Sequence, residues 1–392
     1  MVLVAYVLLG CGIWILVYAY LMWMLRQLPQ LQPQVAGVTP PVKWPKLSII
    51  IPACNEAEHI ETALRSLLAQ DYPTLELIVI DDRSTDATGQ IIDRLAVQDR
   101  RIQAIHISNL PEAWLGKVHA LYQGVQRAHG DWLLFTDADI HFAPGALRRT
   151  LTYALHSHAD HLALLPRVLV QHFWLNVAVR SFGLLFLFTT RAAQVHRSDN
   201  QHYIGVGAFN LVRRSLFERT PGFEWLRLEP ADDAALGMMV KQAGGASRFA
   251  LAEEDLSVSW YPSLSAMFKG LEKNLFGPGA HYQWWRVLFQ VVGAWALAAA
   301  PLVGLIAGLL SESGVMLGAA AVAIATHLVF AVLCADKKPG DSLYLLFFPL
   351  GFLLVNAMMV RAAYRCLRNK GIDWRGTHYS LAQLRAGQRL RF

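Results

Sequence analysis

Charged residues are scarce in this chain of 392 residues: 16% are Asp, Glu, Lys or Arg, whereas 54% are hydrophobic. In soluble proteins about a quarter of all residues are usually charged. The apolar excess is concentrated at the two ends of the chain. The composition therefore argues against two soluble domains and indicates one domain with a membrane part.

Cysteine is scarce too, and the four cysteines form no CxxC pair. We therefore expect neither a disulfide framework nor a zinc site. Fourteen histidines are present, but the HExxH spacing is absent, so we interpret them as ordinary core or surface residues. The net charge of +6 comes mostly from basic residues beside the apolar segments. This pattern is typical of a protein that meets an anionic membrane surface and does not bind nucleic acid.

Residues 2–25 are almost wholly apolar and long enough to cross a bilayer. No basic residue precedes them and no clear cleavage site follows, so we expect a signal anchor. Arg26, Lys43 and Lys46 follow directly, and the positive-inside rule then places the next domain in the cytoplasm. Residues 27–46 are rich in proline and are expected to form an extended tether.

Three apolar segments near the other end, at about 287–310, 315–334 and 343–362, approach the twenty residues of a crossing. Three crossings would place the basic tail outside, against the positive-inside rule. Either one segment is re-entrant or interfacial, with Pro349-Leu350-Gly351 marking the last one, or the charge rule fails here. The stretch 174–190 is interrupted by Arg180, so we interpret it as a helix on the membrane, under the active site, or in a core.

Short apolar runs alternate with amphipathic segments in the middle of the chain. Strands are expected at 47–51, 75–80, 102–107 and just before Asp137, and helices at about 57–70, 87–98 and 117–128. This alternation predicts a parallel sheet with right-handed crossovers. Each strand ends in acidic or amide residues, at the edge where open α/β sheets bind ligands. The arrangement indicates nucleotide binding.

The run Trp132–Phe135 is followed by Thr136 and then by Asp137-Ala138-Asp139. Two carboxylates one residue apart can share one hard cation, either Mg²⁺ or Mn²⁺, whose other positions are filled by substrate phosphates. The motif therefore predicts a divalent metal that holds a diphosphate. The alternative is a solvated turn, where Asp is common.

Four motifs in the same order carry a resemblance to a known family. They are Ile51-Pro52-Ala53-Cys54-Asn55-Glu56, Asp81-Asp82-Arg83-Ser84-Thr85-Asp86, Asp137-Ala138-Asp139 and Asp232-Asp233-Ala234-Ala235-Leu236. Over roughly residues 47–277 the chain resembles family 2 glycosyltransferases of the GT-A fold. The resemblance implies an α/β domain with a mostly parallel sheet, with transmembrane helices at both ends. The expected division is an anchor at 1–26, a Pro-rich linker at 27–46, a GT-A domain at 47–285, transmembrane helices at 286–366 and a basic tail at 367–392.

The resemblance also assigns residues to the donor. It implies donor binding by Pro52, Asn55, Glu56, Asp81, Asp82, Gly116, Lys117, Asp137, Ala138 and Asp139, with the metal at Asp137 and Asp139. Asp82 would contact the uridine; alternatively it, Ser84 or Asp86 caps the helix that follows. Lys117 would place its charge on a phosphate, although a lone Lys at a helix start is usually solvated.

By the same resemblance Asp233, next to Asp232, is the general base that takes the proton of the acceptor. The alternative for this acidic pair is a favourable interaction with the dipole of the helix that follows. The acceptor and sugar side would be lined by Gly205, Gly207, Asn210 and Lys273. Packing glycines and a surface lysine are the alternatives.

One departure narrows the class of enzyme. Processive synthases of the family carry a Q/R-x-x-R-W motif after the base, and this sequence has none. The stretch Gly270–Asn274, G-x-x-K-N, is similar to one in members that glycosylate lipids or terpenoids, including hopanoid-associated and carotenoid glycosyltransferases. The tail stretch Trp374–Tyr379 also looks like a W-R-G-x-x-Y segment of related lipid glycosyltransferases.

We therefore expect a multi-pass enzyme of the inner or cell membrane with a cytoplasmic catalytic domain. It would move a sugar, with inversion, from a nucleotide donor (UDP is the expected nucleotide) to a hydroxyl of a lipid or terpenoid. Two alternatives stay open: a polyisoprenyl-phosphate glycosyltransferase and a non-catalytic membrane scaffold. The sequence leaves the sugar, the acceptor and the oligomeric state open.

Overall fold

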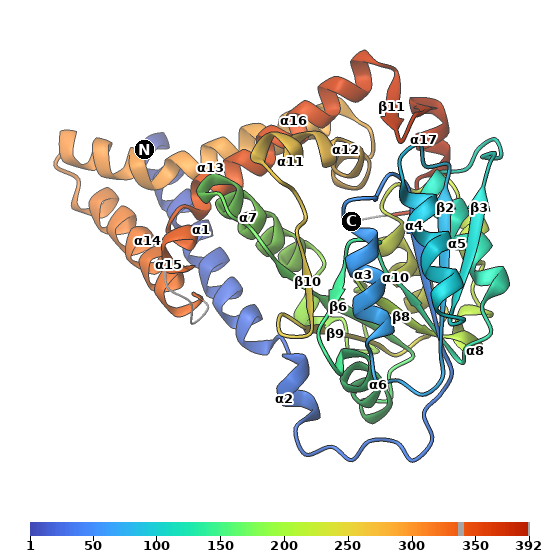
Figure 1. The fold of residues 1–392 in the computed structure, drawn as a ribbon. Coiled ribbons are helices and arrows are strands. Elements are labelled where there is room, and N and C mark those ends of the chain that lie inside the picture. Colours follow the sequence, from blue (N-terminus) through green and yellow to red (C-terminus); the bar gives the residue numbers. More distant parts are fainter. Residues whose placement is uncertain (336–340, 391–392) are drawn as a thin grey trace. The chain divides into compact units, whose positions relative to one another are not determined.

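The computed structural model describes residues 1–335 and 341–390, and their contacts group into two compact units. The sheet unit comprises 28–169, 190–260 and 373–392, and the helical unit comprises 1–27, 170–189 and 261–372. Both are drawn in Figure 1.

The sheet unit is built on a seven-stranded sheet of order β3-β2-β1-β4-β8-β6-β9. The strands of the chain are β1 (Leu47–Ala53), β2 (Leu75–Asp82), β3 (Ile102–Ile107), β4 (Trp132–Phe135), β5 (His141–Phe142), β6 (His161–Leu165), β7 (Arg167–Val168), β8 (Asn210–Arg213), β9 (Ser247–Leu251), β10 (Leu256–Val258), β11 (Gly371–Trp374) and β12 (Thr377–Ser380). The helices of this unit are α2 (Leu31–Val35), α3 (Ile60–Leu68), α4 (Thr88–Gln98), α5 (Gly116–Arg127), α6 (Ala146–His156), the 3₁₀ turn η1 (Ala192–Gln194), α8 (Arg214–Phe217), α9 (Gly222–Trp225), α10 (Asp232–Gln242) and α17 (Leu381–Gly387).

The pairing of the strands brings the polar strand ends to one edge. β1 lies between β2 and β4 and is parallel to both, so the carboxyl ends of these strands share that edge. β8 runs antiparallel to β4, and its first residue, Asn210, lies opposite Phe135. Asn210 therefore reaches the edge where the Asp137 motif begins. The mostly parallel α/β sheet and the strand–helix alternation expected from the sequence are confirmed.

Two local expectations are wrong. The helix expected at about 57–70 is α3, which begins at Ile60. The N–H groups of Glu56 and Ala57 belong to the preceding loop, because they donate to Thr88 Oγ1 and Asp86 Oδ2. Residues 27–46 are not one extended tether either. Their first part contains α2, because burial of Leu31, which is 1% exposed, holds this segment against the sheet unit.

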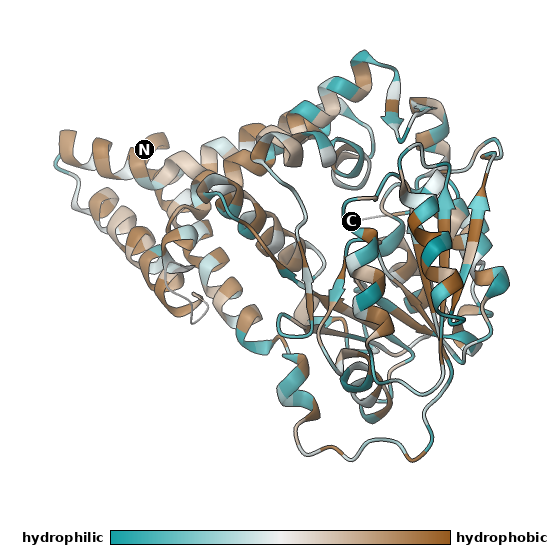
Figure 2. Cartoon of the chain, viewed as in Figure 1, coloured by the Kyte–Doolittle hydropathy of each residue, from teal (hydrophilic) through white to brown (hydrophobic). Residues whose placement is uncertain are grey.

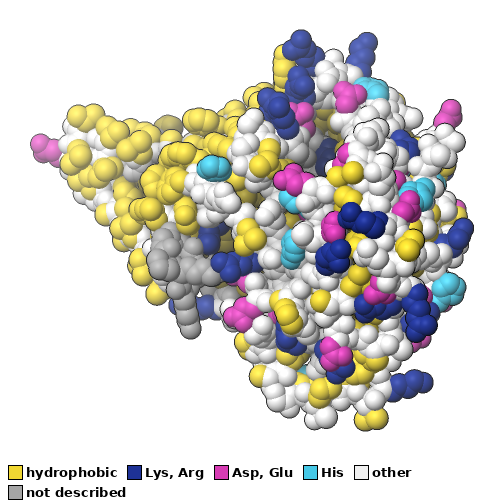
Figure 3. Space-filling model, viewed as in Figure 1, with side chains coloured by type: hydrophobic (Ala, Val, Ile, Leu, Met, Phe, Trp, Pro, Cys, Tyr) yellow, Lys and Arg dark blue, Asp and Glu magenta, His cyan; other side chains and the backbone are white. Residues whose placement is uncertain are grey.

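The helical unit contains α1 (Val2–Gln27), α7 (Phe173–Thr189), α11 (Leu264–Gly270), α12 (Glu272–Ala280), α13 (Trp284–Leu310), α14 (Gly314–Leu333), α15 (Asp341–Leu346) and α16 (Phe348–Arg368). Within the described residues, five helices are long and apolar enough to cross a membrane: α1, α7 with its extension to Gln194, α13, α14 and α16. The hydropathy colouring in Figure 2 is strongly apolar along α1, α13 and α14. Hydrophobic side chains also cover much of the helical unit on the face drawn in Figure 3.

Close contacts join α1 to α13. The Tyr6 hydroxyl donates to the carbonyl of Ala296 at 2.6 Å, and the Trp14 indole N–H donates to Leu297 O at 2.7 Å. Gly10 lies so near Ala300 that a Cβ there would approach the Ala300 Cβ to 2.3 Å. Small residues and interhelical hydrogen bonds of this kind stabilise helix packing in a bilayer.

The apolar segment expected at 343–362 is divided in the structure. α15 ends at Leu346 and α16 starts at Phe348, with Pro349 in its first turn, where the missing N–H is tolerated. This interruption coincides with the irregularity expected at Pro349-Leu350-Gly351.

Candidate active site

A glycine-containing loop lies against the end of β4. The N–H of Asp137 donates to Gly207 O at 3.1 Å, and the Thr136 hydroxyl donates to Ala208 O at 2.7 Å. A Cβ on Gly207 would lie 2.7 Å from Asp137 Oδ2, so only glycine leaves this carboxylate its place. The loop therefore fixes the first carboxylate of the Asp137 motif.

The same loop holds Asp233 at the start of α10. Asp233 accepts hydrogen bonds from the N–H of Gly207 at 2.9 Å and from the N–H of Ala234 at 2.8 Å. Its own carbonyl accepts from Asn210 Nδ2 at 3.2 Å. Burial disfavours the charged form and raises the pKa of Asp233, although Lys117 opposes the shift. A carboxylate with a raised pKa is a better general base.

Lys117 connects the two acidic motifs. Its ammonium lies 2.8 Å from Asp137 Oδ1 and 3.5 Å from Asp232 Oδ2. Burial opposes the charge on Lys117, but Asp137, Asp232 and Asp233 outweigh it, and the pKa of the ammonium is raised. Lys117 is therefore a cation at working pH, placed between the acidic pair and the Asp137 motif.

Asp139 is the carboxylate whose surroundings fit a cation. Burial, followed by the negative charges of Asp137 and Glu56, raises the pKa of Asp139 to about 7. A divalent ion would relieve this repulsion, and Mg²⁺ commonly takes only one or two protein carboxylates together with phosphates. The described residues contain no group of three metal-ligating side chains, so the phosphates of a substrate would have to supply the remaining ligands.

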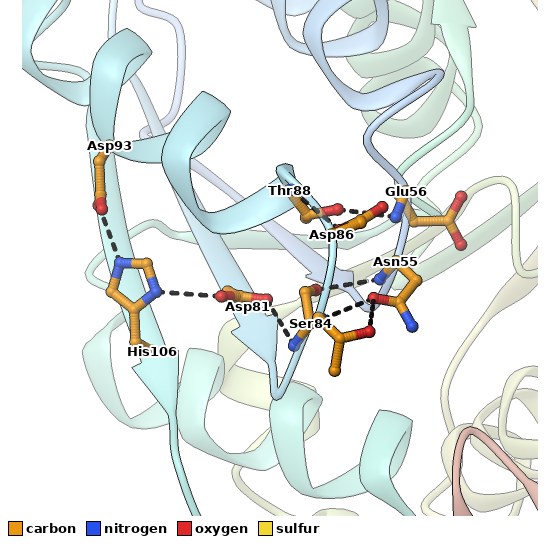
Figure 4. A network of polar contacts seen from close by, with 9 residues as sticks. Asn55, Glu56, Asp81, Ser84, Asp86, Thr88, Asp93 and His106 are labelled. Atoms are coloured by element: carbon orange, nitrogen blue, oxygen red, sulfur yellow. Dashed lines mark hydrogen bonds and ion pairs between the residues drawn. The ribbon is translucent and has the colours of Figure 1, made fainter.

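Hydrogen bonds between side chains and backbone N–H groups join the loops after β1 and β2 (Figure 4). Ser84 Oγ accepts from the N–H of Asn55 at 3.0 Å, and Asn55 Oδ1 accepts from the N–H of Thr85 at 2.8 Å. Asp81 accepts from the N–H of Ser84 at 3.2 Å and lies 3.2 Å from His106 Nδ1. Asn55 and Asp81 therefore position the two loops, a role that their local sequence does not reveal.

Asp82 is buried and forms two hydrogen bonds with the guanidinium of Arg83, at 2.7 and 3.1 Å. Gly116, the first residue of α5, allows this pair to approach, since a Cβ there would lie 2.2 Å from Asp82 Oδ2. Asp82 does not cap the helix that follows: the N-cap position of α4 is Ala87, and Asp86 Oδ1 accepts from the N–H of Thr88, the first residue of α4, at 2.9 Å.

The C-terminal segment contributes residues that the motif search did not assign to the site. Arg375 Nη2 lies 2.6 Å from Glu56 Oε1, Arg83 Nη1 donates to Thr377 Oγ1 at 3.2 Å, and the N–H of Gly116 donates to the Tyr379 hydroxyl at 3.3 Å. The resemblance of Trp374–Tyr379 to a W-R-G-x-x-Y segment was the available signal. The segment is thus part of the sheet unit and not a separate basic tail.

Seven of the sixteen expected site residues line one pocket, and Asp139 is not among them. One pocket of the sheet unit is lined by Pro52, Lys117, Leu121, Phe135, Thr136, Asp137, Gly207, Asn210, Asp232, Asp233 and Leu236. Gly205 contacts the same helix start, because a Cβ on it would lie 1.8 Å from the carbonyl oxygen of Asp233. Ala138, between Asp137 and Asp139 in the sequence, is buried. Lys273 lies on α12 in the other unit, and its acceptor role stays a prediction.

The match to a known family agrees with this geometry. Residues 48–220 match the model of glycosyl transferase family 2. This part of the chain, less than half of its length, is therefore similar to family 2 glycosyltransferases.

Individual relatives were also found. A GalNAc(5)-diNAcBac-PP-undecaprenol beta-1,3-glucosyltransferase of Campylobacter jejuni is 33% identical over 115 residues, 29% of this chain and 36% of that protein. A 4,4'-diaponeurosporenoate glycosyltransferase of Staphylococcus aureus is 30% identical over 202 residues, 49% of this chain and 50% of that protein. The chain thus spans half or less of the length of these curated relatives.

Among solved structures, a mannosyltransferase of Pyrobaculum calidifontis in complex with GDP-Man and Mn²⁺ is similar with a TM-score of 0.57. The similarity covers 94% of this chain and 99% of that one at 20% sequence identity. It supports the GT-A fold.

Proposed function

We propose that this protein is a membrane-bound, inverting glycosyltransferase that moves a sugar from a nucleoside-diphosphate donor to a hydroxyl of a lipid or terpenoid. The observation that carries the proposal is the joint placement of Asp233 and the Asp137 motif around Gly207, with Lys117 between the acidic groups. A base and a diphosphate site side by side are what direct displacement at an anomeric carbon requires.

In this mechanism Asp233 accepts the proton of the acceptor hydroxyl as the oxygen attacks the anomeric carbon. The N–H groups of Gly207 and Ala234 hold the carboxylate in place during the transfer. A divalent metal at Asp139 and Asp137 would supply Lewis-acid stabilisation of the departing diphosphate. Lys117 adds a fixed positive charge beside the same carboxylates.

The lipid class of the acceptor is supported by two observations. The relatives above include one named for an undecaprenol-linked substrate and one named for a carotenoid acid. The chain also contributes helices with the length and composition of membrane spans. UDP is the proposed nucleotide, and the proposed location is the cell membrane with the sheet unit in the cytoplasm.

The decisive experiment is a transfer assay with the detergent-solubilised full chain, a panel of nucleotide sugars, a total lipid extract, and Mn²⁺ or Mg²⁺. The Asp139→Ala and Asp233→Asn variants run beside the wild type. A glycolipid made by the wild type and lost in both variants supports the proposal. If transfer survives in Asp233→Asn but not in Asp139→Ala, the acceptor is a phosphate and not a hydroxyl, because a phosphate acceptor needs little base catalysis. A wild type that binds no nucleotide sugar would leave only a scaffold.

A further inference from the structure

We propose that Arg375, at the tip of the C-terminal hairpin, is a ligand of the donor diphosphate. The inference rests on the proposed function and adds a residue to its donor site. Arg375 lies far along the chain from the other site residues, and its guanidinium nevertheless reaches Glu56 in the loop after β1.

The hairpin presents Arg375 through its turn. β11 ends at Trp374 and β12 starts at Thr377, so the loop has two residues, Arg375 and Gly376, with φ of 51° and 77°. Positive φ at both positions is the requirement of a type I′ turn, whose twist matches that of the paired strands. The turn therefore fixes the direction in which the Arg375 side chain leaves the backbone.

Two contacts of β12, which follows the turn, anchor it to the nucleotide edge. The Tyr379 hydroxyl accepts from the N–H of Gly116, and Thr377 Oγ1 accepts from Arg83. Gly116 and Arg83 in turn contact Asp82 at the end of β2. The hairpin is thus held by the elements that would bind the nucleotide.

The environment of Arg375 has unfilled capacity for an anion. A guanidinium has five N–H donors. The contact of Arg375 with Glu56 is made through Nη2, and the Arg375 side chain is 38% exposed. Asp137 lies close enough to favour its charge. A planar guanidinium suits two phosphate oxygens at once. A bound diphosphate would accept from Arg375 beside the carboxylates that would hold the metal.

The test compares nucleoside diphosphates with their nucleosides. Binding of UDP, GDP, uridine and guanosine in Mn²⁺ is measured by calorimetry on the detergent-solubilised full chain. We expect Arg375→Ala to lower the affinity for the nucleoside diphosphate that the wild type binds by about 10- to 100-fold, the effect of losing a charge-assisted hydrogen bond. The affinity for the nucleoside is expected to stay unchanged. Arg385→Ala, an equal charge change at an exposed position of the same segment, is the control and should bind as the wild type does.

The same Arg375→Ala substitution in a Glu56→Gln variant distinguishes two roles of Arg375. It could contact the phosphate itself, or it could only hold Glu56 in position. If Arg375 contacts phosphate, Arg375→Ala weakens diphosphate binding in that background as well. Equal losses of nucleoside and diphosphate affinity, or no loss in the Glu56→Gln background, would overturn the inference and leave the proposed function intact. A wild type that binds neither UDP nor GDP would overturn both.

A separate observation concerns the crossings of the membrane. β6 precedes α7 and β8 follows it, and these two strands are hydrogen-bonded neighbours. Because paired strands lie on one side of a bilayer, α7 does not cross it. Residues 373–390 likewise pack within the sheet unit; for example, the N–H of Leu390 donates to Glu229 Oε2. The number of crossings between residues 261 and 372 is therefore even.

The geometry points to α13 and α14 as this pair of crossings and to α16 as an interfacial helix. α14 has no charged residue, and α13 has only Arg286, near its start. The apolar part of α16, residues 348–360, spans about 20 Å of helix, against about 30 Å of hydrocarbon. Arg361 follows and lies 2.6 Å from Glu272 of α12. The turn at Glu312 would then lie opposite the C-terminal segment.

Single cysteines test this arrangement. Glu312→Cys and Arg385→Cys are made in a chain whose four native cysteines are replaced by alanine, and cells are treated with a membrane-impermeant maleimide. We expect labelling at 312 in intact cells and at 385 only after lysis. Labelling of both positions in intact cells would overturn the even count, and labelling of neither would overturn the assignment of α13 and α14 as the crossing pair. The reverse pattern would support the count and overturn the cytoplasmic sheet unit.

Discussion

Gly207 donates its N–H to Oδ2 of Asp233 at 2.9 Å and leaves no room for a side chain beside Asp137. One glycine thereby sets the separation between the proposed base and the proposed diphosphate site. A hydroxyl attacking a donor held at Asp137 and Asp139 would meet Asp233 from the acceptor side. The relationship gives the predictions below a common geometric basis.

Replacing Asp233 by asparagine should abolish most of the transfer activity. An amide cannot accept the proton, so kcat is expected to fall by about 10²- to 10⁴-fold. Binding of UDP should change little, because Asp233 is proposed to act on the acceptor; the amide oxygen can keep one of the two hydrogen bonds from Gly207 and Ala234. Product formation and calorimetry on the same preparation separate the two effects. Undiminished kcat would contradict the assignment of the base.

Gly205→Ala should disrupt the active site through the backbone. The new Cβ would lie 1.8 Å from the carbonyl oxygen of Asp233, so the loop or α10 must shift. We expect a loss of about 1–3 kcal/mol of stability together with activity. Gly183→Ala is the matched control, because nothing lies within 4 Å of its Cβ position. Melting temperatures and transfer rates of both variants check this prediction, and equal behaviour would refute it.

Glu229→Ala should release the end of the chain. Glu229 is 1% exposed, and its Oε2 accepts from the N–H groups of Arg389 at 2.7 Å and Leu390 at 3.1 Å. Its loss leaves both donors unsatisfied, at about 1–3 kcal/mol each. Limited trypsin digestion should then cut after the exposed Arg385 at least about tenfold faster. Glu224→Ala, at an exposed position of α9, should digest like the wild type.

His161 should make the folded protein sensitive to mild acid. It is fully buried between Asn210 Oδ1, 2.7 Å from Nε2, and Ser247 Oγ, 3.2 Å from Nδ1. Burial lowers the pKa of His161 from 6.5 to about 4. Between these values the unfolded chain binds a proton that the folded chain does not, so stability falls as pH falls below 6.5.

The full effect is on the order of 3 kcal/mol, from about 2.5 pKa units at 1.36 kcal/mol each. Melting temperatures of the wild type and of His161→Gln between about pH 7 and pH 5 provide the measurement. The wild type should lose more of its melting temperature on acidification than the variant does. Parallel curves would show that His161 does not titrate between the two states.

The sequence by itself determined the secondary elements of the catalytic half and the edge where the site lies. The strand over 102–107 and the helix after Gly116 follow from periodicity, which is a local property of the chain. The acidic ends of β2 and β4 follow from where the apolar runs stop. Parallel pairing then brings these ends to one edge whatever the details of packing.

The tertiary structure decided which polar groups meet. Lys117 pairs with Asp137, and Arg375 reaches Glu56 across 319 positions of sequence. Such pairs depend on how the chain closes on itself, and no periodicity or motif spacing encodes them. The side of the membrane that holds the C-terminal segment also stayed open in the sequence, because charge counting conflicted with the number of apolar segments. Packing of that segment on the sheet unit supplied the missing constraint, since two parts of one folded unit must share a side.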